Sequence, residues 1–198
     1  MTITNEMIRY TAFKLFLENG YEATNVRDIC KEVDIKAASM YFYYKSKQEL
    51  FFSIYNEIFE GYIKFLNEID LMRQNSSPKM KLYVLYRKVL EYYTGDIAKQ
   101  KFLLRYHLFP PADIANLIHE RYKYWTGLEK EVYMAVIQEG LEHKILAEDR
   151  AAEDYLQELR KFLNEQLLGM ILNNVRPNEA EMDRLWIKFW NGTMLNGI

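Results

Sequence analysis

The sequence is poor in the residues that mark several protein classes. Its 198 residues include one cysteine, four prolines, eight glycines and three histidines. One cysteine cannot form an internal disulfide, and three scattered histidines cannot assemble a zinc site, so a disulfide-stapled domain and a zinc finger are excluded. No stretch approaches the roughly 18 apolar residues of a membrane span, and no secretory signal opens the sequence. We therefore expect a cytoplasmic protein.

Catalytic and cofactor-binding motifs are missing as well. The sequence has no nucleophile beside a histidine, no close pair of acids in a recognisable motif and no phosphate-binding loop. We expect neither an enzyme nor a bound cofactor or metal. The formal net charge of -2 and the hydrophobic content of 49% also exclude an intrinsically disordered chain.

Helical periodicity extends along the whole chain. Apolar residues recur at spacings of three and four, and no long segment alternates with a period of two, so we expect an all-α fold. Capping residues, glycines and prolines mark the helix ends. The expected helices are roughly Asn5–Asn19, Asn25–Asp34, a short one from Lys36, Ser46–Leu71, Ser77–Thr94, Ile97–His107, Ala112–Glu142, Arg150–Asn174 and Glu179–Leu195.

The short helix after Lys36 carries an unusual run of aromatic residues. Asp34 precedes it, and we expect Asp34 to adopt the positive φ of a tight turn, which aspartate tolerates better than most residues. Met40 and Tyr44 lie one helical turn apart and can both face inward. Three aromatic side chains are then left outside: Tyr41, Phe42 and Tyr43. Ser46 is expected to cap the next helix, with Glu49 completing a capping box.

The stretch from Gly20 to Leu50, GYEATNVRDICKEVDIKAASMYFYYKSKQEL, resembles the DNA-binding domain of the TetR family of transcriptional regulators. The shared features are the Gly-Tyr after the first helix, the cap before Val-Arg-Asp-Ile, the tyrosine-containing recognition helix and Lys-Ser-Lys-Gln-Glu-Leu. Three positions depart from the family pattern, because Asp34 and Ala38 stand where glycine is usual and Lys36 stands where a capping serine is usual. The resemblance implies a three-helix helix-turn-helix DNA-binding domain.

The resemblance also implies which residues meet double-stranded DNA. Base edges are assigned to Arg27, Ala37, Ser39 and Phe42, and the sugar-phosphate backbone to Asn25, Tyr41, Tyr43 and Lys47, with Lys36 and Lys45 as further cations of this surface. Two alternatives remain open. Arg27 can instead form a surface ion pair with Glu22 or Glu32, and the exposed aromatics can instead pack against another part of the chain.

The charge of this region is weak for a DNA-binding domain. Residues 1–47 hold seven basic and six acidic side chains, so non-specific affinity for DNA should be modest. Specific binding would then depend on the local placement of cations and on doubling the site in a dimer. We expect two domains: residues 1–47 for DNA binding, and residues 48–198 for effector binding and dimerisation.

Aromatic residues gather in the middle of the chain, eleven of them between Tyr83 and Tyr133. A tyrosine ring with a hydroxyl suits a pocket wall, although plain core packing with exposed tyrosines explains any single residue better. In the TetR family this region holds the effector pocket. By that resemblance the residues lining a pocket for a small-molecule effector are Tyr92, Arg105, Tyr106, His107, Tyr122 and Trp125. His107 fits equally a structural histidine beside the Pro110-Pro111 turn.

The last two helices are apolar around most of their circumference. One core contact cannot bury both sides of such helices, so we expect a homodimer, which the family resemblance implies as a four-helix bundle. The residues assigned to dimerisation are Leu163, Leu167, Met170, Ile171, Leu185 and Phe189. The alternative is a monomer in which both helices are sandwiched inside.

Two functions follow from these observations. The first is a ligand-responsive transcriptional regulator, most often a repressor in this family, released from a palindromic operator by a small molecule. The second is an all-α small-molecule carrier whose helix-turn-helix no longer binds DNA, which the weak charge and the departures at Asp34, Lys36 and Ala38 would explain.

Overall fold

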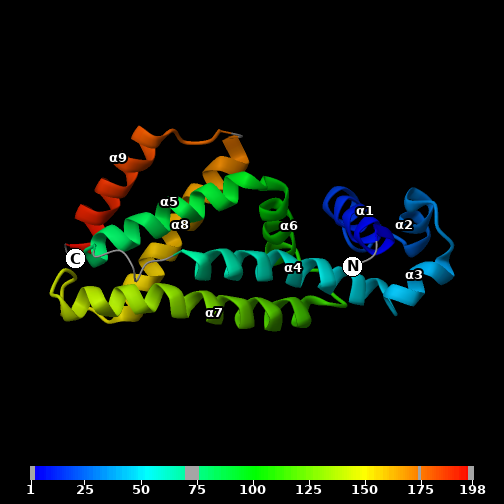
Figure 1. Cartoon of the computed structure of the whole chain (residues 1–198), viewed down its shortest axis with the longest axis horizontal. Coiled ribbons are helices and arrows are strands. Elements are labelled where there is room, and N and C mark those ends of the chain that lie inside the picture. Colours follow the sequence, from blue (N-terminus) through cyan, green and yellow to red (C-terminus); the bar gives the residue numbers. More distant parts are fainter. Residues whose placement is uncertain (1–2, 70–75, 174, 196–198) are drawn as a thin grey trace. The chain divides into compact units, whose positions relative to one another are not determined.

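The computed structural model describes residues 3–69, 76–173 and 175–195, and within these residues the chain is helical without strands. The all-α prediction is confirmed. The helices, shown in Figure 1, are α1 (Ile3–Asn19), α2 (Val26–Val33), α3 (Ala37–Tyr43), α4 (Lys47–Glu68), α5 (Pro78–Gly95), α6 (Ile97–Leu108), α7 (Ala115–Glu142), α8 (Ala152–Asn173) and α9 (Glu179–Phe189), followed by a π-helical turn (Trp190–Met194).

The helix ends lie close to those predicted from the sequence, with two informative differences. The segment from Ala112 forms a turn before α7, in which the Ile114 N–H donates to the Pro111 carbonyl at 3.1 Å. The last helix widens into the π-helical turn before reaching Leu195. Two predicted end residues, Leu71 and Asn174, lie outside the described residues.

Side-chain caps fix several helix starts. Ser46 caps α4 by accepting from the Glu49 N–H at 3.0 Å, as predicted, while the Glu49 carboxylate accepts from the Lys45 N–H at 2.7 Å. Ser77 caps α5, whose first residue is a proline, and Asn178 caps α9 by accepting from the Glu181 N–H at 2.9 Å. These caps satisfy amide groups that have no partner within the helix.

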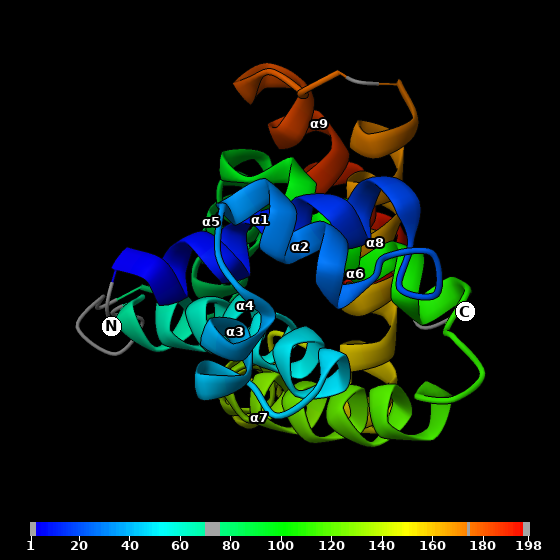
Figure 2. The same ribbon diagram turned by 90° about the vertical axis from the view of Figure 1, so that its right-hand side faces the viewer.

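The chain packs as two compact units. The first unit contains the described residues up to Gly61 together with Ala98–Tyr124. In it α1, α2 and α3 pack with the first half of α4 and with α6, and Figure 2 looks onto α2 and α3. Its fully buried side chains include Ile8, Ala12, Phe16, Ile29, Met40, Leu50, Phe51, Tyr55 and Phe102.

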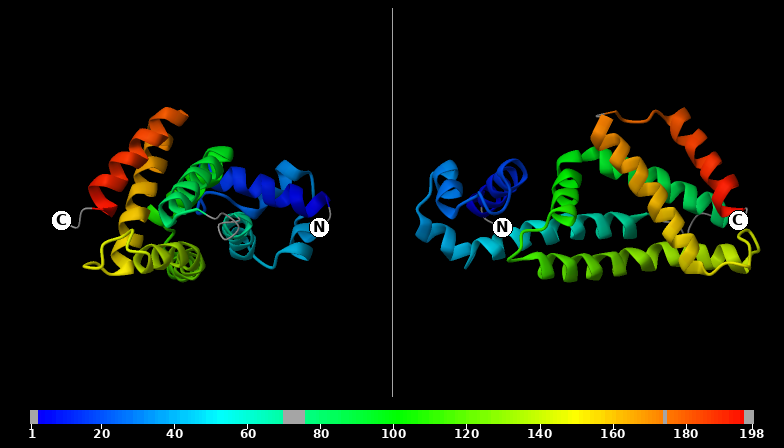
Figure 3. Two further views of the ribbon diagram at one scale, coloured as in Figure 1. Left: turned by 60° about the vertical axis from the view of Figure 1, so that its left-hand side comes forward. Right: turned by 180° about the vertical axis from the view of Figure 1, so that it is seen from behind.

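The second unit contains Tyr62–Ile97 and the described residues from Trp125 onward. Within it α8 packs across α5, and α9 lies beside them (Figure 3). A core of aromatic and aliphatic residues joins these helices, with the rings of Phe162 and Phe189 stacked at 4.3 Å between centroids and Trp186 beside Tyr86 at 5.3 Å. The prediction of domains 1–47 and 48–198 concerns function and stays a prediction.

Candidate functional site

The first candidate site is the helix-turn-helix formed by α2, the turn at Asp34 and α3. Asp34 adopts the left-handed conformation, with φ 57° and ψ 49°, as the sequence predicts. The Ile35 N–H donates back to the Cys30 carbonyl at 2.9 Å, which closes the end of α2. Because the chain reverses within three residues, α3 begins at once at Ala37.

The outer face of α3 is exposed, as expected. Met40 is fully buried and Tyr44 nearly so, and these two residues anchor α3 to the first unit. Tyr41 is 52% exposed and Phe42 is 83% exposed. A phenyl ring that is so exposed gains nothing from the core, so the alternative in which the aromatics pack elsewhere in the chain finds no support in these burial values.

Small and polar residues surround these aromatics. Ala37 and Ser39 on α3 are exposed, as are Asn25, Arg27, Lys36 and Lys45, while Tyr43 is half-buried. Arg27 forms no ion pair with Glu22, Glu32 or any other described residue. We call the nine residues Asn25, Arg27, Lys36, Ala37, Ser39, Tyr41, Phe42, Tyr43 and Lys45 the docking surface.

Lys47, the tenth residue predicted to meet DNA, has its ammonium group engaged inside the first unit. Its Nζ donates to the Tyr21 carbonyl at 2.8 Å and to the Thr24 carbonyl at 3.1 Å, and it lies 4.2 Å from the centroid of the Tyr21 ring. The sequence analysis assigned Lys47 an exposed contact to the DNA backbone. Because two of its donors bind carbonyls of the protein, we define the docking surface without Lys47, and its contact with the DNA backbone stays a prediction.

The residues predicted to line an effector pocket divide between the two units. Arg105, Tyr106, His107 and Tyr122 belong to the first unit, and Tyr92 and Trp125 belong to the second. The Arg105 guanidinium donates to the Leu17 carbonyl at 2.7 Å, and the Tyr106 hydroxyl donates to the Phe16 carbonyl at 2.8 Å. The polar groups of Arg105 and Tyr106 are therefore bound to α1.

His107 is held between aromatic side chains of the first unit. Its Nε2 lies 2.8 Å from the Tyr55 hydroxyl, and its ring centroid lies 4.3 Å from that of Tyr122. Burial lowers the pKa of His107 to about 4. The hydrogen bond to Tyr55 is what the alternative of a structural histidine requires, and Tyr122, which is partly exposed, covers the ring.

A polar cluster that the sequence analysis missed lies in the core of the second unit. The Tyr62 hydroxyl donates to the Glu129 carboxylate at 3.0 Å and lies 3.2 Å from the Tyr133 hydroxyl. Arg160 donates to the other oxygen of Glu129 at 2.9 Å. Burial raises the pKa of Glu129, although Arg160 opposes that shift. The four residues come from α4, α7 and α8, and no local sequence pattern brings them together.

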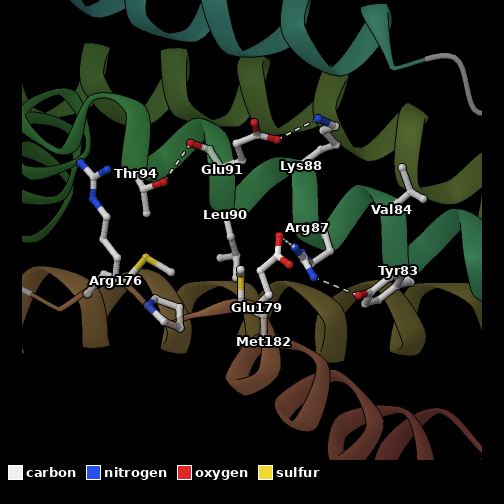
Figure 4. A pocket seen from close by; sticks show the side chains of 12 residues that line it. Tyr83, Val84, Arg87, Lys88, Leu90, Glu91, Thr94, Arg176, Glu179 and Met182 are labelled. Carbon is white, nitrogen blue, oxygen red and sulfur yellow. Dashed lines mark hydrogen bonds and ion pairs between the residues drawn. The ribbon is translucent and has the colours of Figure 1, made fainter.

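The second unit also holds a pocket of about 650 Å³ between α5, the end of α8 and the start of α9 (Figure 4). Its lining includes Leu90, Met170 and Met182. Arg87 crosses it and pairs with Glu179 at 3.0 Å, while Arg176, at the rim, has no ion pair or hydrogen bond with the described residues. This size suits a small organic molecule. Of the residues predicted to bind an effector, none lines this pocket.

The predicted dimerisation residues divide into two groups. Leu163, Met170 and Phe189 are buried in the core of the second unit, so they serve the single chain. Leu167, Ile171 and Leu185 are half-buried. The apolar residues of α8 and α9 that are most available to a partner are others: Leu168, Leu172 and Ile187, of which Leu172 is 73% exposed.

Among the described residues, no helix has the length and apolarity needed to cross a bilayer. No group of three or more His, Cys, Asp or Glu side chains in this part of the chain is arranged to hold a metal ion.

Comparison with known proteins matches the N-terminal region to one family. Residues 8–54 match the model described as "Bacterial regulatory proteins, tetR family". The chain is 28% identical over 137 residues to the "Probable HTH-type transcriptional regulator YttP" of Bacillus subtilis (strain 168), covering 69% of this chain and 64% of that protein. It is 38% identical over 81 residues to IcaR, the HTH-type negative transcriptional regulator of the biofilm operon icaADBC of Staphylococcus aureus, covering 41% of each. The chain thus spans less than two thirds of the length of these curated relatives.

Solved structures share the fold along nearly the full length. The fatty acid degradation regulator FadR from Bacillus halodurans superposes with a TM-score of 0.74, at 15% identity and 99% coverage of both chains. FadR from Bacillus subtilis, in complex with stearoyl-CoA, gives a TM-score of 0.73 at 18% identity, covering 94% of this chain and 98% of that one. At such identities the likeness shows the fold, which here is helical throughout.

Proposed function

The N-terminal domain of this chain belongs to the TetR family of bacterial regulatory proteins, and from that premise we propose that the chain is a ligand-responsive DNA-binding transcriptional regulator. One observation carries the proposal. The outer face of α3 exposes Tyr41 and Phe42 beside Ala37 and Ser39, while Met40 holds the helix in place from behind. A helix that enters a major groove needs this combination of a fixed inner face and an exposed outer one.

The docking surface divides by chemistry between bases and backbone. Ala37, Ser39 and Phe42 can meet base edges, including the thymine methyl group, and Arg27 can donate to guanine. Asn25, Tyr41, Tyr43 and the two lysines, Lys36 and Lys45, can donate to phosphates, which sets register without reading sequence. Since this surface carries only three cations, its affinity for DNA depends on shape complementarity more than on charge.

We propose further that two copies bind a palindromic operator. Half-sites on one face of B-DNA lie about 34–36 Å apart, and a two-fold dimer presents two α3 helices to them. The exposed Leu168, Leu172 and Ile187 supply an apolar face for the second copy. Repression is favoured over activation because one relative, IcaR, is a negative regulator.

The proposed effector is a small molecule bound in the helical body, outside residues 1–47. The two FadR neighbours regulate fatty acid degradation and one holds stearoyl-CoA, so acyl-CoA thioesters are the first compounds to screen. An effector releases DNA only if it binds the DNA-free conformation more tightly, and linkage requires the operator to weaken the effector by the same factor. Coupling of this kind is typically about 1–3 kcal/mol.

The experiment is selection of duplexes from a random-sequence pool by the purified full chain. We expect enrichment of an inverted repeat, and nanomolar binding of the selected duplex at physiological salt. Failure to enrich any duplex, together with no shift of the DNA upstream of its own gene, would contradict DNA binding. If the chain binds no DNA but its melting temperature rises with a ligand, the alternative function of a small-molecule carrier would be favoured.

A further inference from the structure

The end of α1 and the turn that follows it, residues 16–25, are held by side chains from two other helices. We propose that Lys47, Arg105 and Tyr106 are positioning residues that fix this end of the helix-turn-helix, and that Lys47 influences DNA affinity through this contact instead of touching a phosphate. The proposal rests on the proposed DNA-binding function. We call these three side chains and the carbonyls they bind the carbonyl clamp.

Lys47 supplies the α4 side of the clamp. An ammonium group has three N–H donors. Two of them donate to the carbonyls of Tyr21 and Thr24, at 2.8 and 3.1 Å, and the Tyr21 ring face covers the group at 4.2 Å. These two bonds and the Tyr21 ring hold the ammonium group against the turn. Moving it outward to a phosphate would leave two carbonyls without their donor, which carries a desolvation cost.

Arg105 and Tyr106 supply the α6 side. They donate to the carbonyls of Leu17 and Phe16, at 2.7 and 2.8 Å. Both carbonyls lie in the last turn of α1, where backbone acceptors are short of donors from the helix itself. The Phe16 carbonyl also accepts from the Gly20 N–H at 3.1 Å, so the Tyr106 hydroxyl is its second donor. Consecutive residues of α6 thus bind the end of α1 across a separation of about ninety residues in the sequence.

Gly20 keeps space for this contact. Its φ is +91°, and a Cβ built on it would lie 2.7 Å from Nη2 of Arg105. A side chain at this position would require the guanidinium to move, so glycine serves here both as the helix-ending residue and as the space that the guanidinium occupies. The close approach shows that Arg105 is part of the local packing.

Aromatic packing joins the two sides of the clamp. The ring of Phe51, on α4, lies 5.3 Å from that of Tyr21 and 4.8 Å from that of Tyr106, and the ring of Phe16 lies 5.6 Å away. The turn, α4 and α6 thus share one cluster. Movement of α6 relative to α4 would pull on the end of α1, and with it on α2 and α3.

A positioning residue and a phosphate contact have different salt signatures. Losing a phosphate contact reduces the slope of log affinity against log salt by about 0.9 and weakens specific and non-specific binding alike. Losing a positioning residue tilts the docking surface. Specific affinity should then fall while the salt slope and the non-specific affinity stay as they were, because the phosphate contacts made by other residues remain.

The test compares Lys47→Met with Lys45→Met, its exposed neighbour, in the full chain. Binding to the selected duplex and to a scrambled duplex is measured by fluorescence anisotropy over a series of salt concentrations, at a temperature where each variant is folded. We expect Lys47→Met to lower the ratio of specific to non-specific affinity about tenfold with an unchanged slope. A slope reduced by about 0.9, or binding equal to wild type, would overturn the proposal.

A second measurement needs no DNA and so separates this proposal from the proposed function. Tyr106→Phe removes a single oxygen and should leave the fold intact. Amide hydrogen exchange in residues 16–25 should accelerate at least tenfold in both Tyr106→Phe and Lys47→Met, and stay unchanged in Lys45→Met. Unchanged exchange in Tyr106→Phe and Lys47→Met would contradict the carbonyl clamp, whatever the chain binds. Accelerated exchange in a chain that binds no DNA would support the clamp and contradict the proposed regulatory function.

Discussion

The imidazole of His107 shows how one buried residue can set a pH dependence. Its pKa is lowered to about 4 by burial, whereas a histidine in the unfolded chain titrates near its ordinary value of about 6.5. At a pH between these two pKa values, His107 is protonated in the unfolded chain and neutral in the folded chain. Stability is therefore lost as the pH falls from about 6.5 toward 4.

We predict that titration of His107 lowers the free energy of unfolding by about 2 kcal/mol when the pH is lowered from 7 to 5. His107→Gln, whose amide can still accept from Tyr55, should make the chain that much less sensitive to pH. Urea denaturation at the two pH values measures the difference. His143→Gln is the control, because His143 is exposed. An unaltered pH dependence in His107→Gln would show that the imidazole titrates normally.

Two glycines should respond to alanine with opposite signs. At Gly20, alanine meets both the positive φ and the Arg105 guanidinium, so we predict a loss of about 2 kcal/mol in unfolding free energy. Gly127 lies within α7 with no atom within 4 Å of a built Cβ, so alanine there should add about 0.5 to 1 kcal/mol. Chemical denaturation of both variants checks the pair, and a stabilised Gly20→Ala would contradict the clamp geometry.

Local rules predicted single residues well only where the partners are near in sequence. Asp34 at positive φ, Ser46 as a cap and the inward Met40 each depend on neighbours within a few positions, and all three are confirmed. Arg105 and Tyr106 bond to α1 from about ninety residues away, and that partnership leaves no trace in local spacing. The sequence analysis assigned the same two residues to an effector pocket, on the family resemblance alone.

At the scale of helices, α8 and α9 show why periodicity predicts the position of a helix more easily than the surface against which the helix packs. Their apolar residues cover most of the circumference, so the sequence could not separate the side that packs inward from the side left outside. The structure buries Met170 and Phe189 in the core of the second unit and leaves Leu172 and Ile187 exposed. The positions of α8 and α9 were therefore predictable, whereas the faces that they bury were not.

This division leads to a prediction about assembly. Leu172→Glu and Ile187→Glu place charge on exposed positions of a single chain, so each variant should fold and sediment as a monomer where the wild type is a dimer. Phe189→Glu should unfold the second unit instead, since it buries a charge. Leu108→Glu, at an exposed leucine of α6, serves as the control and should remain dimeric. A wild type that is monomeric at micromolar concentration would contradict the proposed dimer.

At the scale of the whole molecule, charge would contribute little to the proposed DNA binding. The chain carries a net charge of -2, and its first 47 residues are nearly neutral. Non-specific binding should therefore be weak, and operator affinity should come from two docking surfaces acting together. Any ligand that alters how the two copies present α3 would then act on both contacts at once.

The proposal that the exposed face of α3 recognises DNA is tested most directly by two variants, Phe42→Ala and Phe109→Ala. The measurement is the dissociation constant of each variant for the selected duplex. Both residues are exposed phenylalanines of the first unit, at 83% and 77%, and Phe109 lies after α6, outside the docking surface. Removing either ring should leave the fold unchanged, so any difference in DNA binding reports on position. We predict binding at least tenfold weaker for Phe42→Ala and within twofold of wild type for Phe109→Ala; equal affinities for the two variants would contradict DNA recognition by α3.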